Sequence, residues 1–161
     1  MIFRVRPATK SDRNELVAMR MLLWPDSSPD EQLHEVDRAL SKGMSGTLPG
    51  IVLVAELTNE PASQSSNQSL IGFLEAGLRS HADGCDTAQP VGFVEGWFVR
   101  EEHRNQGVGR RMMGVLEDWA REQGCIELAS DALITEEGSL RAHSALGFEV
   151  VDRCVHFRKA L

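Results

Sequence analysis

The sequence predicts an α/β protein with a mixed, largely antiparallel central sheet and helices on both faces of that sheet. Short runs rich in β-branched and aromatic residues alternate with segments whose apolar residues recur every three or four positions. The expected order along the chain is β-α-α-β-β-β-α-β-α-β-β. A length of 161 residues, 42% of them hydrophobic, suits a single domain spanning residues 1–161 with its own core.

The first part of the chain predicts one strand and two helices. Residues Ile2–Arg6 alternate in polarity and are typical of a strand. Thr9 or Ser11 can cap the helix that follows. Two prolines interrupt the chain in the loop 24–29, and a second helix is expected from about residue 30 to residue 42.

Two strands and two polar loops are expected next. Ile51–Leu57 and Leu70–Leu78 are apolar runs that can pair as a hairpin. The stretch Thr58–Ser69 between them is polar and serine-rich, so we expect a mobile loop without chemistry. A second polar loop, Ser80–Pro90, follows.

The strongest local signal is a strand, a glycine loop and a helix in succession. Val91–Val99 is rich in β-branched and aromatic residues, which indicates a buried strand. Gly107 and Gly109 open a long helix, and they let backbone N–H groups converge without Cβ obstruction. Because the first turn of a helix leaves N–H groups unpaired at the positive end of its dipole, this loop suits a phosphate or pyrophosphate.

Neither common phosphate-binding motif explains this loop. A P-loop requires G-x-x-x-x-G-K-[ST], whereas a single residue separates Gly107 from Gly109 and Arg110 comes next. The dinucleotide fingerprint requires a third glycine that is missing here. A plain turn before a helix stays open as an alternative.

The last part of the chain predicts a short strand, a helix and two closing strands. The strand Cys125–Ala129 ends at Ser130 and Asp131, and the helix covers Ser139–Leu146. Phe148–Val151 and Val155–Arg158 are expected to close the sheet. We expect His143 to be a packed surface histidine without a chemical role.

Three residues have both a structural and a functional interpretation. Glu95 lies within the central strand, where alternation puts Phe93 and Trp97 on its face, so it either pairs with an arginine or lines a cleft. Trp24 is either a core residue at a helix end or a flat wall for a sugar ring. Asp131, just past a strand, is either a turn residue or a ligand contact.

Composition argues against several classes of function. With 17 Lys and Arg against 24 Asp and Glu, the net charge is −7, which disfavours nucleic acid as a partner. This charge can attract a cationic substrate, or it only keeps the protein in solution. No apolar stretch approaches a membrane span, and the first residues lack the apolar core of a signal peptide. Three widely spaced cysteines favour reduced thiols in the cytoplasm and argue against a metal site.

Several short motifs together resemble one known family. The pattern Arg104-x-x-Gly107-x-Gly109, between a strand and a long helix, resembles the acyl-CoA motif of the GCN5-related N-acetyltransferases. The wider pattern is similar to that of the aminoglycoside 6'-N-acetyltransferases. It comprises Leu23-Trp24-Pro25, Gly84-Cys85-Asp86, Glu95-Gly96, Phe98-Val99, Ala129-Ser130-Asp131 and His143-x-Ala145-Leu146-Gly147-Phe148-Glu149.

The resemblance implies the acyl-CoA N-acyltransferase fold and acetyl-CoA as the acetyl donor, without a metal. In that fold two central strands splay apart, so backbone groups of 91–99 would stay free to pair with the pantetheine arm. The implied donor contacts are Phe98, Val99, Arg104, Asn105, Gln106, Gly107, Val108, Gly109 and Arg110. A homodimer is also implied.

The resemblance further implies transfer of acetyl to the 6'-amine of an aminoglycoside by direct attack. Glu95 would take the amine proton, directly or through water, and Asp131 would orient the amine. The implied acceptor contacts are Trp24, Asp26, His81, Asp83, Asp86, Glu95 and Asp131. Protein N-termini, polyamines or other small amines are alternative acceptors, and a non-catalytic acyl-CoA-binding module is a further alternative. The chain has no tyrosine, although many members of the superfamily use one to protonate the leaving thiolate.

Overall fold

The centre of the molecule is one sheet with the strand order β1-β3-β4-β5-β6, and the short strand β2 pairs with β3 at its side. The computed structural model describes residues 2–42, 44–45, 48–58 and 70–160. Neighbouring strands run antiparallel, except that β5 and β6 are parallel. The strands are β1 (Phe3–Pro7), β2 (Met44–Ser45), β3 (Leu48–Leu57), β4 (Leu70–Arg79), β5 (Val91–Val99) and β6 (Leu128–Ser130).

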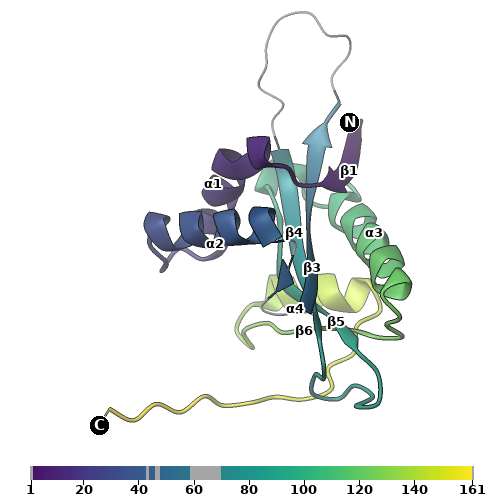
Figure 1. Cartoon of the computed structure of the whole chain (residues 1–161). Coiled ribbons are helices and arrows are strands. Elements are labelled where there is room, and N and C mark those ends of the chain that lie inside the picture. Colours follow the sequence, from purple (N-terminus) through teal and green to yellow (C-terminus); the bar gives the residue numbers. More distant parts are fainter. Residues whose placement is uncertain (1, 43, 46–47, 59–69, 161) are drawn as a thin grey trace, which may run out of the picture.

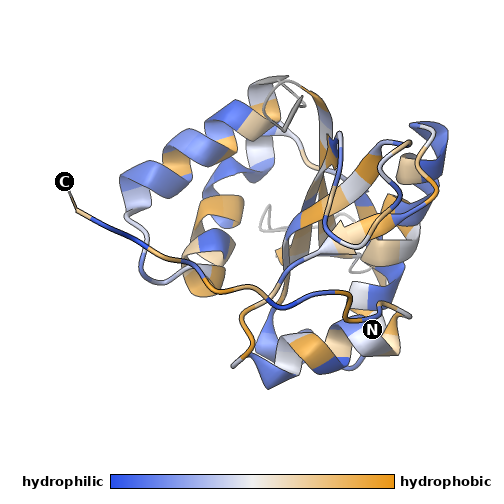
Figure 2. Cartoon of the chain, turned by 90° about the horizontal axis from the view of Figure 1, so that it is seen from below, coloured by the Kyte–Doolittle hydropathy of each residue, from blue (hydrophilic) through white to orange (hydrophobic). Residues whose placement is uncertain are grey.

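Helices cover both faces of this sheet (Figure 1). α1 (Arg13–Leu23) and α2 (Pro29–Lys42) lie on one face, α3 (Val108–Glu122) lies on the other, and α4 (Glu137–Ala145) follows β6. Short 3-10 turns η1 (Lys10–Asp12) and η2 (Glu101–His103) precede α1 and α3. Hydrophobic and hydrophilic residues alternate in bands along the helices (Figure 2), as expected for helices that rest one side on a sheet.

Each face of the sheet has its own apolar core. On the α3 face, Leu53, Leu74 and Val94 pack against Met112 and Leu116 of the helix. On the α1/α2 face, a separate cluster packs strand residues against these two helices. Its buried members are Leu16, Met19, Val36, Val54, Leu70, Phe73 and Phe98.

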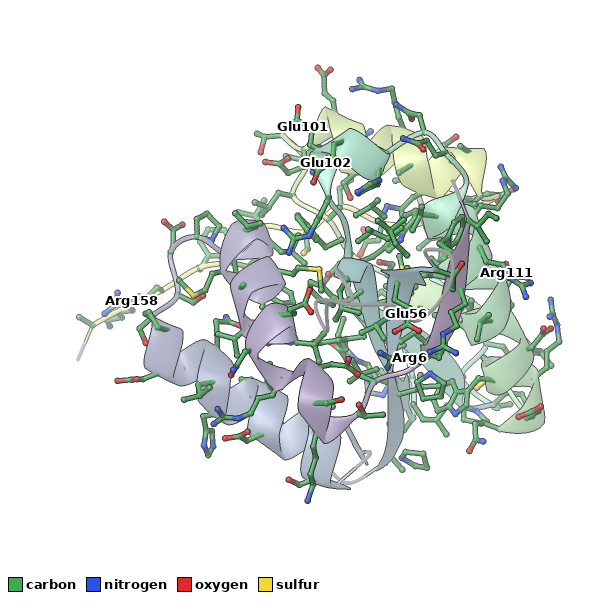
Figure 3. All side chains as sticks on the ribbon, turned by 90° about the horizontal axis from the view of Figure 1, so that it is seen from above. Arg6, Glu56, Glu101, Glu102, Arg111 and Arg158 are labelled. Carbon is green, nitrogen blue, oxygen red and sulfur yellow. The ribbon has the colours of Figure 1, made fainter. Side chains whose placement is uncertain are left out.

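A buried ion cluster fixes the connection from β1 to α1. Arg6 donates to Asp12 at 2.7 and 2.9 Å and to Glu56 of β3 at 2.6 and 2.9 Å; Arg6 and Glu56 point toward one another (Figure 3). Asp12 also accepts a hydrogen bond from the Thr9 backbone N–H at 2.7 Å and so caps η1. The Arg6 guanidinium lowers the pKa of Asp12, and against the cost of burial it also lowers the pKa of Glu56.

The predicted fold class is confirmed, and the two predicted closing strands are wrong. Residues 149–160 have no regular structure and are exposed. Val151 lies against Gly84, and the chain beyond it extends away from the rest of the molecule (Figure 1). Their composition favours strands, yet a strand needs a neighbour to pair its backbone groups, and no described strand lies beside them. The short strand β2 was not expected, and most of the predicted loop Thr58–Ser69 lies outside the described residues.

Candidate active site

A bulge in β5 turns Glu95 toward the α1/α2 face of the sheet. Glu75 of β4 is opposite Gly96, whereas Ala76 is opposite Val94, so Glu95 is the extra residue. A Cβ built on Gly96 would lie 2.6 Å from the ring of Trp24, which covers the bulge from the α1 side. The expectation that Trp97 shares the face of Glu95 is therefore wrong, because the bulge interrupts the alternation.

Glu95 lines a cavity of about 340 Å³ between β3, β4, β5 and the two helices α1 and α2. Trp24 lines this cavity and also packs against the apolar cluster of the α1/α2 face, so its position agrees with both of its interpretations. The lining residues are Arg20, Trp24, Glu35, Arg38, Ala39, Gly50, Ile51, Val52, Glu75, Ala76 and Glu95.

Each carboxylate of this cavity has an arginine partner. Arg79 donates to both oxygens of Glu95, at 3.2 and 2.8 Å, and its guanidinium lies over the ring of Phe93. Glu95 is therefore both a paired carboxylate and a cavity residue, so its two interpretations hold together. Arg38 pairs with one oxygen of Glu35, and both residues belong to α2.

The Arg20–Glu75 pair is the most deeply buried of the three. Its two side chains are 9% and 12% exposed. Burial raises the pKa of Glu75, while the charge of Arg20 opposes that rise. Arg20 also donates to Gln32 at 2.5 Å and lies 4.5 Å above the Trp24 ring, so one guanidinium joins α1, α2 and β4 at the cavity floor.

The other predicted acceptor residues lie outside the lining of this cavity. Asp26, His81, Asp83 and Asp86 are exposed. Asp86 stabilises its own loop: its backbone N–H donates to Glu127 at 2.7 Å, and its side chain accepts from the Ala88 N–H at 2.9 Å. Asp131 is exposed and follows the last residue of β6.

One edge of β5 is free next to this bulge. β6 pairs with β5 only from Gly92 to Val94, opposite Leu128 to Ser130. Among the described residues, the β5 segment from Glu95 to Val99 has no strand beside it on the β6 side. The predicted splay between two central strands is thus present, and it leaves backbone groups that an extended arm can pair with.

The glycine loop lies at the end of that free edge and opens α3. Gly107 is the N-cap with φ of 83°, and the backbone of Asn105 is also left-handed, with φ of 58°. The first helical bond is donated by Arg111 to Gly107 at 2.9 Å, so the preceding N–H groups have no partner within the helix. A Cβ on Gly109 would lie 2.5 Å from the Trp97 ring, so this site requires glycine.

The two arginines among the implied donor contacts, Arg104 and Arg110, already have protein partners. Arg104 Nε donates to the Val99 carbonyl at 3.0 Å, and Arg110 donates to the Ala145 carbonyl at the end of α4 at 2.9 Å. They therefore hold the loop to β5 and to α4, while the backbone N–H groups of the first turn of α3 stay available to an anion. The loop therefore offers an anion mainly backbone N–H groups.

A splayed sheet, a free edge on the central strand and a glycine loop at a helix start together define an acyl-CoA-dependent N-acyltransferase fold. The sequence profile described as the acetyltransferase (GNAT) family matches residues 14–148, and the chain belongs to this family.

The chain has full-length relatives among the aminoglycoside N(6')-acetyltransferases type 1. The enzyme of Klebsiella aerogenes is 37% identical over 157 residues, which cover 98% of this chain and 96% of the relative. That of Stenotrophomonas maltophilia is 34% identical, with 98% and 93% covered. Among solved structures, AAC(6')-Ih from Acinetobacter baumannii is 32% identical with a TM-score of 0.81, covering 99% of each chain. AAC(6')-Iy with a CoA bisubstrate analogue is 28% identical, with a TM-score of 0.82 and full coverage of both chains.

Sequence reasoning missed five charged residues of the site, namely Arg20, Glu35, Arg38, Glu75 and Arg79. Glu75 interrupts the apolar strand β4 and Arg79 ends it, and these charges are the signal that could have identified the two residues. Arg20 belongs to an ordinary amphipathic helix and gave no comparable signal. Within the described ranges, no group of three or more His, Cys, Asp or Glu side chains is placed to hold a metal ion. No helix among the described residues is long and apolar enough to cross a bilayer.

Proposed function

We propose that this protein transfers acetyl from acetyl-CoA to the 6'-amine of an aminoglycoside. The observation that carries the proposal is the double use of β5. Its bulge directs Glu95 into a carboxylate-lined cavity, and the free edge of the same strand leads to the glycine loop of α3. The full-length relatives named for this activity support the choice of acceptor.

The acceptor amine is mostly cationic near neutral pH and must lose a proton before it can attack the thioester. The carboxylates of the cavity attract the cation, and Glu95 takes the proton directly or through one water. Asp131, just past the end of β6, orients the amine. The nitrogen then attacks the thioester carbonyl, while a backbone N–H near Phe98 or Val99 stabilises the developing oxyanion.

No protein nucleophile is needed in this reaction. When both substrates are bound on the same strand, their proximity and orientation account for much of the rate acceleration. Trp24, fixed between Arg20 and Gly96, supplies an apolar wall for one ring of the acceptor. Asp26, His81, Asp83 and Asp86 are the proposed outer contacts for further ammonium groups.

The direct test is release of free thiol from acetyl-CoA with tobramycin as acceptor. The matched control is an aminoglycoside with a 6'-hydroxyl in place of the 6'-amine. We expect rapid release with the amine and none with the hydroxyl analogue. Equal release with both would contradict the regiochemistry. No release with tobramycin, together with release on spermidine or a peptide N-terminus, would favour the alternative acceptors.

We also propose that the protein is a cytoplasmic homodimer. The exposed segment 149–160 carries Val151, Val155 and Phe157 at 62%, 75% and 93% exposure, an apolar surface that a second copy can cover. Light scattering should then give a mass of twice the 17.8 kDa of one chain. Phe157→Asp should lower the measured mass toward that of the monomer. The free thiols of Cys85, Cys125 and Cys154 support a reducing compartment.

A further inference from the structure

The proposed reaction leaves one proton transfer without an assigned residue. When the C–S bond of the thioester breaks, its electron pair goes to sulfur, and the CoA thiolate takes up a proton. The chain has no tyrosine for this step. This inference rests on the acetyl transfer of the proposed function, although not on the identity of the acceptor.

His143 of α4 makes a hydrogen bond through each of its ring nitrogens. Nδ1 lies 2.8 Å from the Ser139 carbonyl, which can only accept, so Nδ1 carries a proton. Nε2 lies 2.9 Å from the Ser130 hydroxyl. The ring also packs edge-on against Trp97 and Phe148, with centroids 5.7 and 5.2 Å apart. These contacts fix the imidazole and direct Nε2 at one hydroxyl group.

Ser130 lies at the point where β5 and β6 separate. It is the last residue of β6, it pairs with Val94, and the bulge at Glu95 begins one residue further along β5. An acyl-CoA arm that follows the free edge of β5 from the α3 loop would bring its thioester to this point. Arg110 holds the end of α4 to the first turn of α3, so His143 is fixed relative to the same loop.

We propose that the Ser130 hydroxyl donates the proton to the departing CoA thiolate, and that His143 supplies the proton behind it. As sulfur takes the Ser130 proton, the serine oxygen takes the Nε2 proton of an imidazolium. The neutral imidazole is then protonated again from solvent. The amine loses one proton and the thiolate gains one, so the reaction balances. An imidazole can exchange protons near neutral pH, which suits it to this task.

A structural role for His143 would be packing against Trp97 and Phe148. His143→Phe keeps an aromatic ring in that position and removes the proton, so it separates the two roles. The two serines that touch the imidazole provide a matched pair. Ser130→Ala removes the proposed donor, whereas Ser139→Ala keeps the backbone carbonyl that orients Nδ1.

The experiment compares steady-state kinetics of these variants with the parent, using tobramycin as acceptor. We expect kcat to fall about 10- to 100-fold in Ser130→Ala and His143→Phe. This loss is at or below the lower limit for general acid catalysis, because a thiolate leaves readily even without a proton. Both KM values should stay close to those of the parent, and Ser139→Ala should retain the parent kcat. The double variant Ser130→Ala/His143→Phe should be no slower than either single variant, because the two groups act as a unit.

Chemical rescue gives a second, independent measurement. Added imidazole should restore turnover of His143→Ala, which leaves room for it, and should not restore His143→Phe. Parent kcat in Ser130→Ala, or a His143→Ala enzyme that imidazole does not rescue, would overturn the proposal. If the parent acetylates spermidine and not tobramycin, the proposed acceptor is wrong, and the same variants are compared with spermidine.

Discussion

The two faces of the central sheet use the same strands for different purposes. On the α3 face, Leu53, Leu74 and Val94 are at most 2% exposed and pack in one apolar cluster with Met112 and Leu116 of the helix. On the α1/α2 face, the same strands β4 and β5 present Glu75, Arg79 and Glu95 next to a cavity. The α3 face is an apolar core, whereas the α1/α2 face holds buried ion pairs beside its own apolar core.

This difference separates stability from chemistry. Apolar burial stabilises the fold wherever it occurs, whereas a buried charge is costly unless a partner satisfies it. The α1/α2 face can hold its carboxylates because each has its own arginine. We therefore expect changes in the apolar core of the α3 face to affect stability without affecting binding of the acceptor, and changes on the α1/α2 face to affect both.

The largest loss of stability should come from breaking the buried pair on the α1/α2 face. Arg20→Met leaves the Glu75 carboxylate without its cation, which should lower the free energy of unfolding by about 3–5 kcal/mol in urea titration. Arg20→Met/Glu75→Gln should recover much of that loss. Arg13→Met is the matched control, because its pair with Asp37 joins the same two helices at the surface. Equal losses in Arg13→Met and Arg20→Met would contradict the account.

Changes in the apolar core of the α3 face should lower stability and leave acceptor binding unchanged. Leu116→Ala removes a fully buried side chain and should lower the free energy of unfolding by about 3 kcal/mol. The KM for tobramycin should stay unchanged at temperatures where the variant is folded. A rise in the KM for tobramycin in Leu116→Ala would show that the two faces are not separate.

A smaller effect is expected at the start of α3, where two glycines can be compared. Gly109→Ala puts a methyl group 2.5 Å from the Trp97 ring, so it should cost about 1–3 kcal/mol by overpacking and should also raise the KM for acetyl-CoA. Gly114 of the same helix has nothing within 4 Å of a built Cβ. Gly114→Ala should therefore stabilise the protein by about 0.5–1 kcal/mol. An unchanged acetyl-CoA KM in Gly109→Ala would argue against the loop as the donor site.

The Arg6 cluster should make stability depend on pH only in the acid range, and this is the smallest effect expected. Because the pKa of Asp12 is lower in the folded state than its ordinary value of 3.8, its ionised form stabilises the fold above that value. This contribution is lost as the pH falls through the folded-state pKa. The stability difference between the parent and Asp12→Asn should thus be full at pH 7 and shrink on acidification. A difference that grows on acidification would contradict the lowered pKa.

The sequence predicted the parts of the molecule that depend on local patterns. β5 has the bounds Val91–Val99 that its composition predicted, and α3 begins at the glycine loop. The features that the sequence did not predict depend on how strands far apart in the chain pair with one another. The bulge opposite Glu75 moved Trp97 to the α3 face, and residues 149–160 lacked a neighbouring strand. The contact between His143 and Ser130 joins residues 13 apart on different elements, so no short motif could indicate it.

The central claim is that Glu95 serves the acceptor while the α3 loop holds the donor. Its most direct test is Glu95→Gln, a change that removes the base and keeps the shape of the side chain. We predict that the dissociation constant for acetyl-CoA, measured by calorimetry, stays within about twofold of the parent, while single-turnover transfer to tobramycin slows by about 100-fold or more. Transfer at the parent rate in Glu95→Gln would contradict the claim.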